Sequence, residues 1–107
     1  MDKDNIYKKH ILDAVDTVEE YVKGLSFSEF EKNKLVRDGV IRELEVIGEA
    51  AKRLSVEFKA LVPAIPWRQV TGTRDKLIHD YMSVDLEEVW QIVKSDLPSL
   101  KQKLIAR

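Results

Sequence analysis

The chain contains no cysteine, few residues that break helices and no long apolar run. The lack of cysteine excludes a disulfide framework, a thiol nucleophile and any cysteine-ligated zinc or iron–sulfur site. Four glycines and three prolines are too few turn-forming residues for an all-β sandwich. No stretch approaches the ~20 apolar residues that span a bilayer, and the charged N-terminus is not typical of a signal peptide. We therefore expect an all-α protein of the cytoplasm that makes no contact with membranes.

The chain also lacks a large net charge, because 18 basic residues nearly balance 19 acidic ones. This balance gives no general attraction to nucleic acid or to anionic lipid, so any contact with RNA must be local. The one local excess of positive charge lies near the C-terminus, where four basic residues stand against Asp96 alone: Lys94, Lys101, Lys103 and Arg107. With 44% hydrophobic residues, residues 1–107 are expected to form a single compact domain.

The first half of the chain predicts two long helices. Apolar side chains recur at three- and four-residue steps from Ile6 to Leu25 and predict a long amphipathic helix, which Gly24 ends as a left-handed cap. Residues 26–29 have the spacing of a capping box and predict a short helical turn. A second long helix is expected from near Asn33, with one apolar face: Leu35, Val36, Val40, Leu44, Ile47, Ala51 and Leu54.

Two glycines, Gly39 and Gly48, lie on or near the apolar face of this second helix. Glycine inside a helix costs roughly 0.5–1 kcal/mol relative to alanine. The two positions therefore indicate either that another backbone approaches closely or that the helix tolerates two defects.

The second half of the chain predicts two more helices after a connection. Residues 55–66 contain two prolines and are expected to form the longest connection. A third helix is predicted over residues 67–82. A fourth begins at Asp85, where Glu88 repeats the capping spacing, and Pro98 is expected to bend or restart it. These four helices and the additional short turn favour an antiparallel four-helix bundle.

The strongest candidate for chemistry is a cluster in the third predicted helix. The sequence has no phosphate-binding glycine loop, no nucleophile elbow and no His-Glu-x-x-His metal pair. Of the two histidines, His10 stands alone, whereas His79 lies in a run that also contains Arg74 and Tyr81. A guanidinium suits phosphate oxygens, an imidazole titrates near neutral pH, and a phenol stacks on bases. Together these groups suit phosphodiester chemistry; the alternative is an exposed charged helix face.

The helical positions of these residues predict a site made by two subunits. At 100° per residue, Arg74 and Tyr81 lie within about 20° of each other, whereas His79 lies about 140° from Arg74. Asp75 shares a face with His79, so its carboxylate is placed to accept a hydrogen bond from the imidazole. One straight helix does not gather all three groups. A two-fold homodimer that brings two such helices together is the simplest way to do so.

The pattern Arg-x4-His-x-Tyr at residues 74–81 resembles the signature of the HEPN superfamily, and in particular of the HepT-like toxins of prokaryotes. Residues 40–55, with the sequence VIRELEVIGEAAKRLS, resemble the second helix of that family. The run from Ile65-Pro66-Trp67 to His79 resembles its third helix. The similarity covers nearly the whole chain, and these segments follow one another in the family's order.

This resemblance implies an all-helical homodimer whose motif-bearing helices line a cleft at the interface. It implies a metal-independent endoribonuclease with no cofactor, in which Arg74 and His79 are catalytic on an RNA substrate. It also implies a partner, an MntA-like minimal nucleotidyltransferase antitoxin that silences the toxin by transferring AMP to the motif tyrosine, here Tyr81. One departure is Asp75, where relatives often carry asparagine, because the aspartate adds negative charge beside the expected phosphate site.

Several interpretations stay open at this level. Glu49 on the second helix either holds Arg74 as a supporting residue or is solvated. Lys76 either contacts RNA phosphate or faces water. For the whole protein, the alternatives to a nuclease are a non-catalytic helical adaptor that binds a nucleotidyltransferase, and a purely structural dimer.

Overall fold

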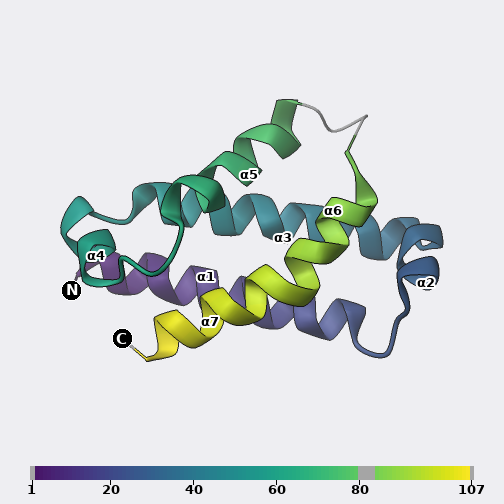
Figure 1. The fold of residues 1–107 in the computed structure, drawn as a ribbon, viewed down its shortest axis with the longest axis horizontal. Helices are drawn as coiled ribbons and strands as arrows, with labels where there is room; N and C mark the ends of the chain where they lie inside the picture. Colours follow the sequence, from purple (N-terminus) through teal and green to yellow (C-terminus); the bar gives the residue numbers. More distant parts are fainter. Residues whose placement is uncertain (1, 80–83, 107) are drawn as a thin grey trace.

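The computed structural model describes residues 2–79 and 84–106, and every regular element in these ranges is a helix (Figure 1). The all-α class predicted from the sequence is confirmed. The elements are α1 (Lys3–Val22), α2 (Phe27–Lys32), α3 (Lys34–Arg53), α4 (Val56–Leu61), α5 (Trp67–His79), α6 (Leu86–Gln91), the π-helical segment η2 (Ile92–Asp96) and α7 (Leu97–Ile105). None of the described helices is both long and apolar enough to cross a membrane.

The long helix α3 is the centre of the fold. α1 runs antiparallel to it and packs along its length, while α5 packs mainly against α3 (Figure 1). α6, η2 and α7 follow one another as a single curved helix, which contacts α2 at its start and α1 at its end. The largest fully buried side chains form the core between these helices: Phe30, Ile11, Leu104, Val15, Val18 and Val40. Burial of this apolar surface is the main force that holds the helices together.

The four long helical segments expected from the sequence are present as α1, α3, α5 and the α6 to α7 run. α5 differs from the others, since its C-terminal end rises away from the rest of the molecule (Figure 1). The regular antiparallel four-helix bundle and the two-fold homodimer stay predictions.

The predicted helix ends of the first half are confirmed. Gly24 follows Lys23, the C-cap of α1, and has φ +78°, the left-handed conformation that glycine adopts without strain. Ser26 and Glu29 form a reciprocal capping box at α2: the Glu29 N–H donates to Ser26 Oγ (3.2 Å) and the Ser26 N–H donates to Glu29 Oε1 (2.9 Å). Asn33 caps α3 by accepting from the N–H of Val36 (3.1 Å).

The predicted apolar face of α3 holds for Val36 and the residues after it, but not for Leu35, whose side chain is 84% exposed. At 100° per residue, Leu35 lies about 100° from Val36 and farther still from most of the buried face. Its inclusion in the core was therefore wrong.

A short helix occupies part of the segment that the sequence predicted to be one long connection. α4 begins after Ser55, whose hydroxyl accepts from the N–H of Phe58 (3.0 Å). Both prolines of the segment, Pro63 and Pro66, lie after the end of α4, so they stop this helix rather than prevent it. The expectation of an uninterrupted connection is corrected accordingly.

The start of α4 is fastened to the start of α1. The Asp4 carboxylate accepts from the N–H of Ser55 (2.8 Å) and from its hydroxyl (2.6 Å). These two hydrogen bonds, first the one from the hydroxyl, lower the pKa of Asp4 below its usual value of 3.8. Two segments that are 51 positions apart in sequence are thus joined by one carboxylate.

The last helix begins where the sequence predicted. Asp85 caps α6 by accepting from the N–H groups of Glu87 (3.0 Å) and Glu88 (3.4 Å). Pro98 lies in the first turn of α7, directly after the π-helical segment η2. Proline has no N–H to donate and its ring clashes with the carbonyl four residues earlier, so the helix widens before it. The prediction that Pro98 bends or restarts this helix is confirmed.

Candidate functional site

α5 carries Arg74 past α3 at a point where α3 has no side chain. Gly48 is buried on α3, and a β carbon built on it would overlap the β carbon of Arg74 and lie 3.3 Å from its α carbon. Only glycine allows so close an approach. Of the two alternatives that the sequence left open, the close approach of a second backbone holds at Gly48, whereas the neighbour of Gly39 is the ring of Tyr21.

Two carboxylates hold the guanidinium of Arg74. Its Nε lies 3.0 Å from Oε2 of Glu49 on α3, and its Nη1 lies 3.1 Å from Oδ1 of Asp75 on α5. The Arg74 side chain is 25% exposed, so it still reaches solvent. Within the described residues, no acceptor bonds its second terminal nitrogen, Nη2. Arg74 is thus fixed from two sides and still presents N–H donors to a ligand.

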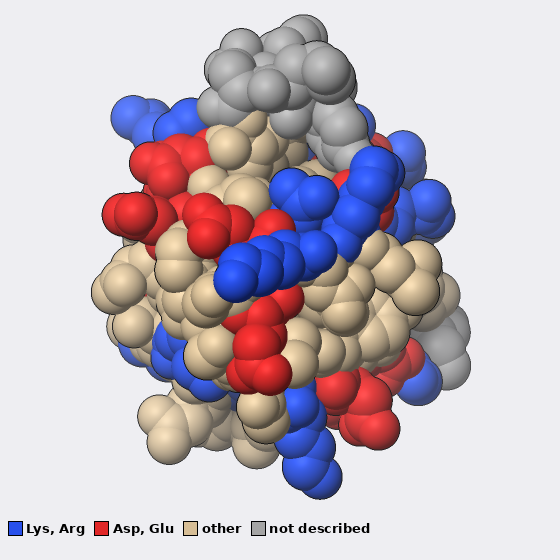
Figure 2. Space-filling view, turned by 90° about the vertical axis from the view of Figure 1, so that its right-hand side faces the viewer, with Lys and Arg blue, Asp and Glu red and all other residues tan. Residues whose placement is uncertain are grey.

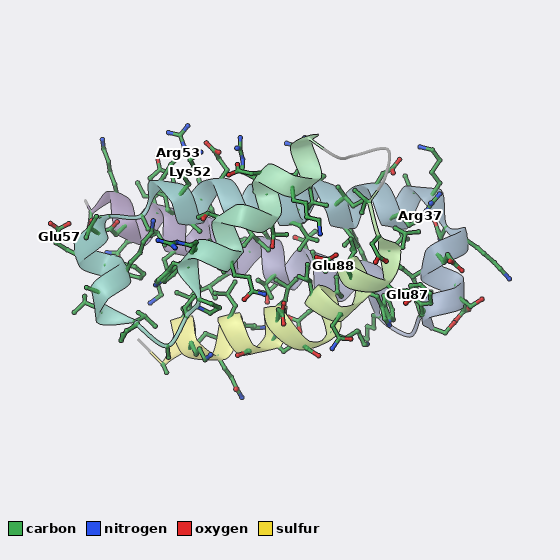
Figure 3. The ribbon with its side chains drawn as sticks, turned by 45° about the horizontal axis from the view of Figure 1, so that its top comes forward. Arg37, Lys52, Arg53, Glu57, Glu87 and Glu88 are labelled. Atoms are coloured by element: carbon green, nitrogen blue, oxygen red, sulfur yellow. The ribbon has the colours of Figure 1, made fainter. Side chains whose placement is uncertain are left out.

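The polar contacts continue from Glu49 to a third helix. Oε1 of Glu49 accepts from Nε of Arg53 (3.1 Å), one turn later on α3, while its other oxygen faces Arg74. The pKa of Arg53 is raised above its usual value, first by its hydrogen bond to the Tyr7 hydroxyl on α1 and then by Glu49. Arg53 points outward from the C-terminal part of α3, beside Lys52 (Figure 3). Polar side chains therefore connect α1, α3 and α5.

The other residues of the predicted motif lie at or beyond the end of α5. His79 is the last residue of α5, and its side chain lies outside what the structure describes. Tyr81 lies outside the described residues altogether. The predicted contact between Asp75 and the imidazole of His79 is likewise not described; the described partner of Asp75 is Arg74. The catalytic roles of Arg74 and His79 stay predictions.

An ion pair joins the second half of α5 to α6. Nζ of Lys76 lies 2.9 Å from Oε2 of Glu88, which Figure 3 labels on α6. Glu88 therefore does not complete the reciprocal capping box expected with Asp85, because its carboxylate bonds Lys76 instead. Lys76 has a protein partner, which neither of the two sequence-based interpretations included.

Three of the four basic residues near the C-terminus have partners within the fold, and the fourth, Arg107, lies outside the described residues. Lys101 on α7 lies 2.7 Å from Asp16 and 3.1 Å from Glu19, and both carboxylates raise its pKa. Lys103 donates to the carbonyl of Ala64, and the ammonium of Lys94 lies over the ring of Trp90. At the end of the molecule where α2 and α6 lie, acidic and basic side chains are interspersed (Figure 2). The local excess of charge in the sequence therefore does not by itself mark an RNA surface.

Three residues near Arg74 were not predicted from the sequence as site residues: Tyr7, His10 and Arg53. They line one open depression together with Glu49 and Arg74. The spacing of Glu49 and Arg53, four residues apart on one helix, was the available signal, because such pairs face each other. Tyr7 and His10 have the corresponding three-residue spacing on α1. Among the described residues, no group of three or more histidine, aspartate or glutamate side chains is arranged to hold a metal ion.

Comparison with known proteins finds a family model and several relatives that are similar to this chain. A family model described as ribonuclease HepT-like matches residues 11–106. A Thermococcus cleftensis protein named "Probable ribonuclease HepT" is 45% identical over 97 residues, which are 91% of this chain and 88% of that protein. The Methanocaldococcus jannaschii protein "Putative RNase MJ1380" is 39% identical over 94 residues, covering 88% of this chain and 86% of that protein. No solved structure matches this chain significantly.

Proposed function

Since the chain belongs to the HepT-like ribonuclease family, we infer that it is an endoribonuclease and the toxin of a toxin–antitoxin pair. The observation that carries this proposal is the placement of Arg74, which Gly48 brings against α3 and two carboxylates hold there. A guanidinium that is fixed in position and retains N–H donors is suited to bind the oxygens of a phosphodiester.

The proposed reaction needs no metal, because RNA supplies its own nucleophile. The 2′-hydroxyl attacks the adjacent phosphorus while His79 takes its proton, and the bond from phosphorus to the 5′-oxygen breaks. A second acid, which we assign to His79 of the partner subunit, protonates the leaving 5′-oxygen. Arg74 stabilises the negative charge that builds on the phosphorane oxygens. The products are a 2′,3′-cyclic phosphate and a 5′-hydroxyl end.

Glu49 and Asp75 are supporting residues in this proposal. Glu49 forms an ion pair with Nε of Arg74, and Asp75 accepts a hydrogen bond from its Nη1, so that the two carboxylates together hold the guanidinium. Their negative charges also offset the positive charge of Arg74 when no substrate is bound. A phosphodiester that binds Arg74 therefore competes with two carboxylates for the same cation. Asp75 thereby tunes the affinity of the site for phosphate.

The complete site belongs to a two-fold homodimer of four-helix domains. Arg74 and His79 lie five residues apart on α5, so their positions are about 140° apart around one helix. Pairing two α5 helices places the Arg74 of one subunit near the His79 of the other. The position of α5, which packs mainly against α3 and rises from the rest of the molecule, is compatible with this pairing (Figure 1).

Control of the toxin is assigned to an MntA-like minimal nucleotidyltransferase that attaches AMP to Tyr81. The phenolic oxygen attacks the α-phosphorus of ATP and pyrophosphate leaves, so the tyrosine gains a bulky anion two residues from His79. Such a group excludes the RNA phosphate by size and by charge.

A cleavage assay tests the proposed activity. The purified protein is incubated with RNA in excess chelator, beside His79→Ala. We expect the parent to cut the RNA and the variant to leave it intact, because general acid–base catalysis contributes roughly 10²–10⁴-fold. Intact RNA with both proteins would reject the nuclease and favour the adaptor that only binds a nucleotidyltransferase.

A further inference from the structure

An open depression of about 440 Å³ lies beside Arg74, between α1, α3 and α5. Its volume falls within the range of pockets that bind small organic ligands. The polar side chains that line it are Tyr7, His10, Glu45, Glu49, Arg53 and Arg74. Arg74 is shared with the proposed catalytic site, so any ligand in the depression lies next to the phosphate that Arg74 would bind.

Two of the lining groups are aromatic rings. Tyr7 is half-buried and His10 is exposed, and their rings meet edge to face with centroids 5.8 Å apart. Arg53 lines the same depression beside Tyr7, whose hydroxyl contributes most to the raised pKa of Arg53. The planar guanidinium of Arg53 adds a third flat surface. Aromatic rings and arginine planes are the groups on which proteins stack unpaired bases.

Glu45 supplies a free acceptor at the same place. Its side chain is half-buried on α3, and within the described residues no cation or hydrogen-bond donor bonds its carboxylate. Glu49, one turn later, is instead shared between two arginines. Desolvation of a carboxylate costs free energy unless a ligand or water bonds it, so Glu45 is poised to accept N–H groups from a ligand.

The mixture of groups indicates a base rather than a second phosphate. The two arginines are balanced by two glutamates among the lining residues, so the depression has no strong positive charge. A phosphate would gain little there. A base suits the site better, since it needs flat surfaces for stacking and acceptors for its N–H edge.

We propose that this depression binds one unstacked base of single-stranded RNA next to the phosphate at Arg74, with the base N–H groups donating to Glu45. The proposal rests on RNA being the substrate. Guanine fits best, because its N1–H and its 2-amino group together donate to both oxygens of one carboxylate. Uracil offers a single N–H flanked by two carbonyl oxygens, and these oxygens repel the carboxylate electrostatically.

The test uses short RNA strands with 2′-O-methyl groups, which cannot be cut, so that binding is measured apart from cleavage. Each strand carries one guanosine or only uridines, and the dissociation constants are measured for the parent and Glu45→Gln. We expect the parent to bind the guanosine strand on the order of tenfold more tightly. Glu45→Gln should lose this preference, whereas Glu57→Gln, which changes an exposed glutamate of α4, should keep it (Figure 3).

A spectroscopic measurement checks where the base lies. The chain has two histidines, so the imidazole NMR signals of His10 are assigned by comparison with His79→Gln. The guanosine strand should shift the His10 signals. A guanosine preference that survives Glu45→Gln, or unmoved His10 signals in the presence of bound strand, would overturn the subsite. If the guanosine preference depends on Glu45 and the His10 signals shift, but ordinary RNA is not cut, only the nuclease activity is rejected. If ordinary RNA is cut but neither of these two effects is seen, only the base-binding subsite is rejected.

Discussion

Gly48 on α3 lies directly against the β carbon of Arg74 on α5, so closely that no larger residue fits between them. The arginine that carries the family motif is therefore placed by the absence of a side chain on a neighbouring helix. The same helix then supplies Glu49, the next residue, whose carboxylate bonds the guanidinium. Position and orientation of Arg74 thus depend on two consecutive residues of α3.

Gly48→Ala is expected to destabilise the protein by about 1–3 kcal/mol, the usual cost of forcing an extra group into packed surroundings. The gain in helix propensity from alanine, at most ~1 kcal/mol, does not offset it. Gly72→Ala is the matched control, because a β carbon at Gly72 on α5 meets nothing within 4 Å. Urea unfolding should show a lower midpoint for the first variant and an equal or higher one for the second. Equal urea midpoints for Gly48→Ala and Gly72→Ala would contradict this prediction, because they would show that α5 moves away from α3 at no cost in stability.

Arg74→Lys is expected to lower the cleavage rate by about 10²–10³-fold, as when one donor that stabilises a transition state is lost. Lysine keeps the charge but lacks the planar set of N–H groups that contacts two carboxylates and that, in the proposed reaction, also binds the phosphate. Single-turnover cleavage of one RNA measures this, with Arg42→Lys, an exposed arginine of α3, as the control. If Arg74→Lys cut RNA at the same rate as the parent protein, the positive charge alone would be sufficient and the planar N–H groups would not be needed.

Glu49→Gln tests whether this residue positions Arg74 for the reaction. The amide still fits but carries no negative charge to pair with the two arginines, so the guanidinium of Arg74 is no longer held on the side of α3. We expect kcat to fall about tenfold, with KM and the melting temperature nearly unchanged. A fall in melting temperature with an unchanged kcat would instead assign Glu49 a structural role.

Asp4 should make the stability of the protein depend on pH in acid. Its pKa is lowered in the folded state by the hydrogen bonds from Ser55, relative to a usual value of 3.8. The stabilisation is therefore fully present above that value and is lost as the pH falls through the lower, folded-state pKa. In Asp4→Asn, urea unfolding should show lower stability at pH 6 and a weaker dependence on pH below 4. Asp13→Asn, an exposed carboxylate bonded by Lys9, should change neither; an equal effect of both would contradict the assignment.

Local features of the fold could be predicted from the sequence because they depend on neighbouring residues. The capping box of Ser26 and Glu29, the Asn33 cap and the effect of Pro98 each follow from a spacing of a few positions. The α4 helix was missed because two prolines suggested a break, although the Ser55 cap lies before both of them.

The surroundings of Arg74 could be predicted only in part, because they depend on how helices pack. The sequence marked Gly48 as a place of close approach but did not identify what approaches. It left Glu49 open between a contact with Arg74 and solvent, and the structure shows the contact. The contribution of α1 could not be derived, since nothing in the order of residues relates Tyr7 or His10 to a motif more than 60 positions away.

The most direct test of the account is the chemistry of the cut ends. A short RNA is treated with the protein in excess chelator, and the fragments are identified by mass spectrometry, beside a strand with one 2′-deoxy nucleotide on the 5′ side of the cleaved bond. Attack by the 2′-hydroxyl predicts 2′,3′-cyclic phosphate and 5′-hydroxyl ends, and no cut at the deoxy position. Fragments with 5′-phosphate ends, or cleavage at the deoxy position, would contradict it.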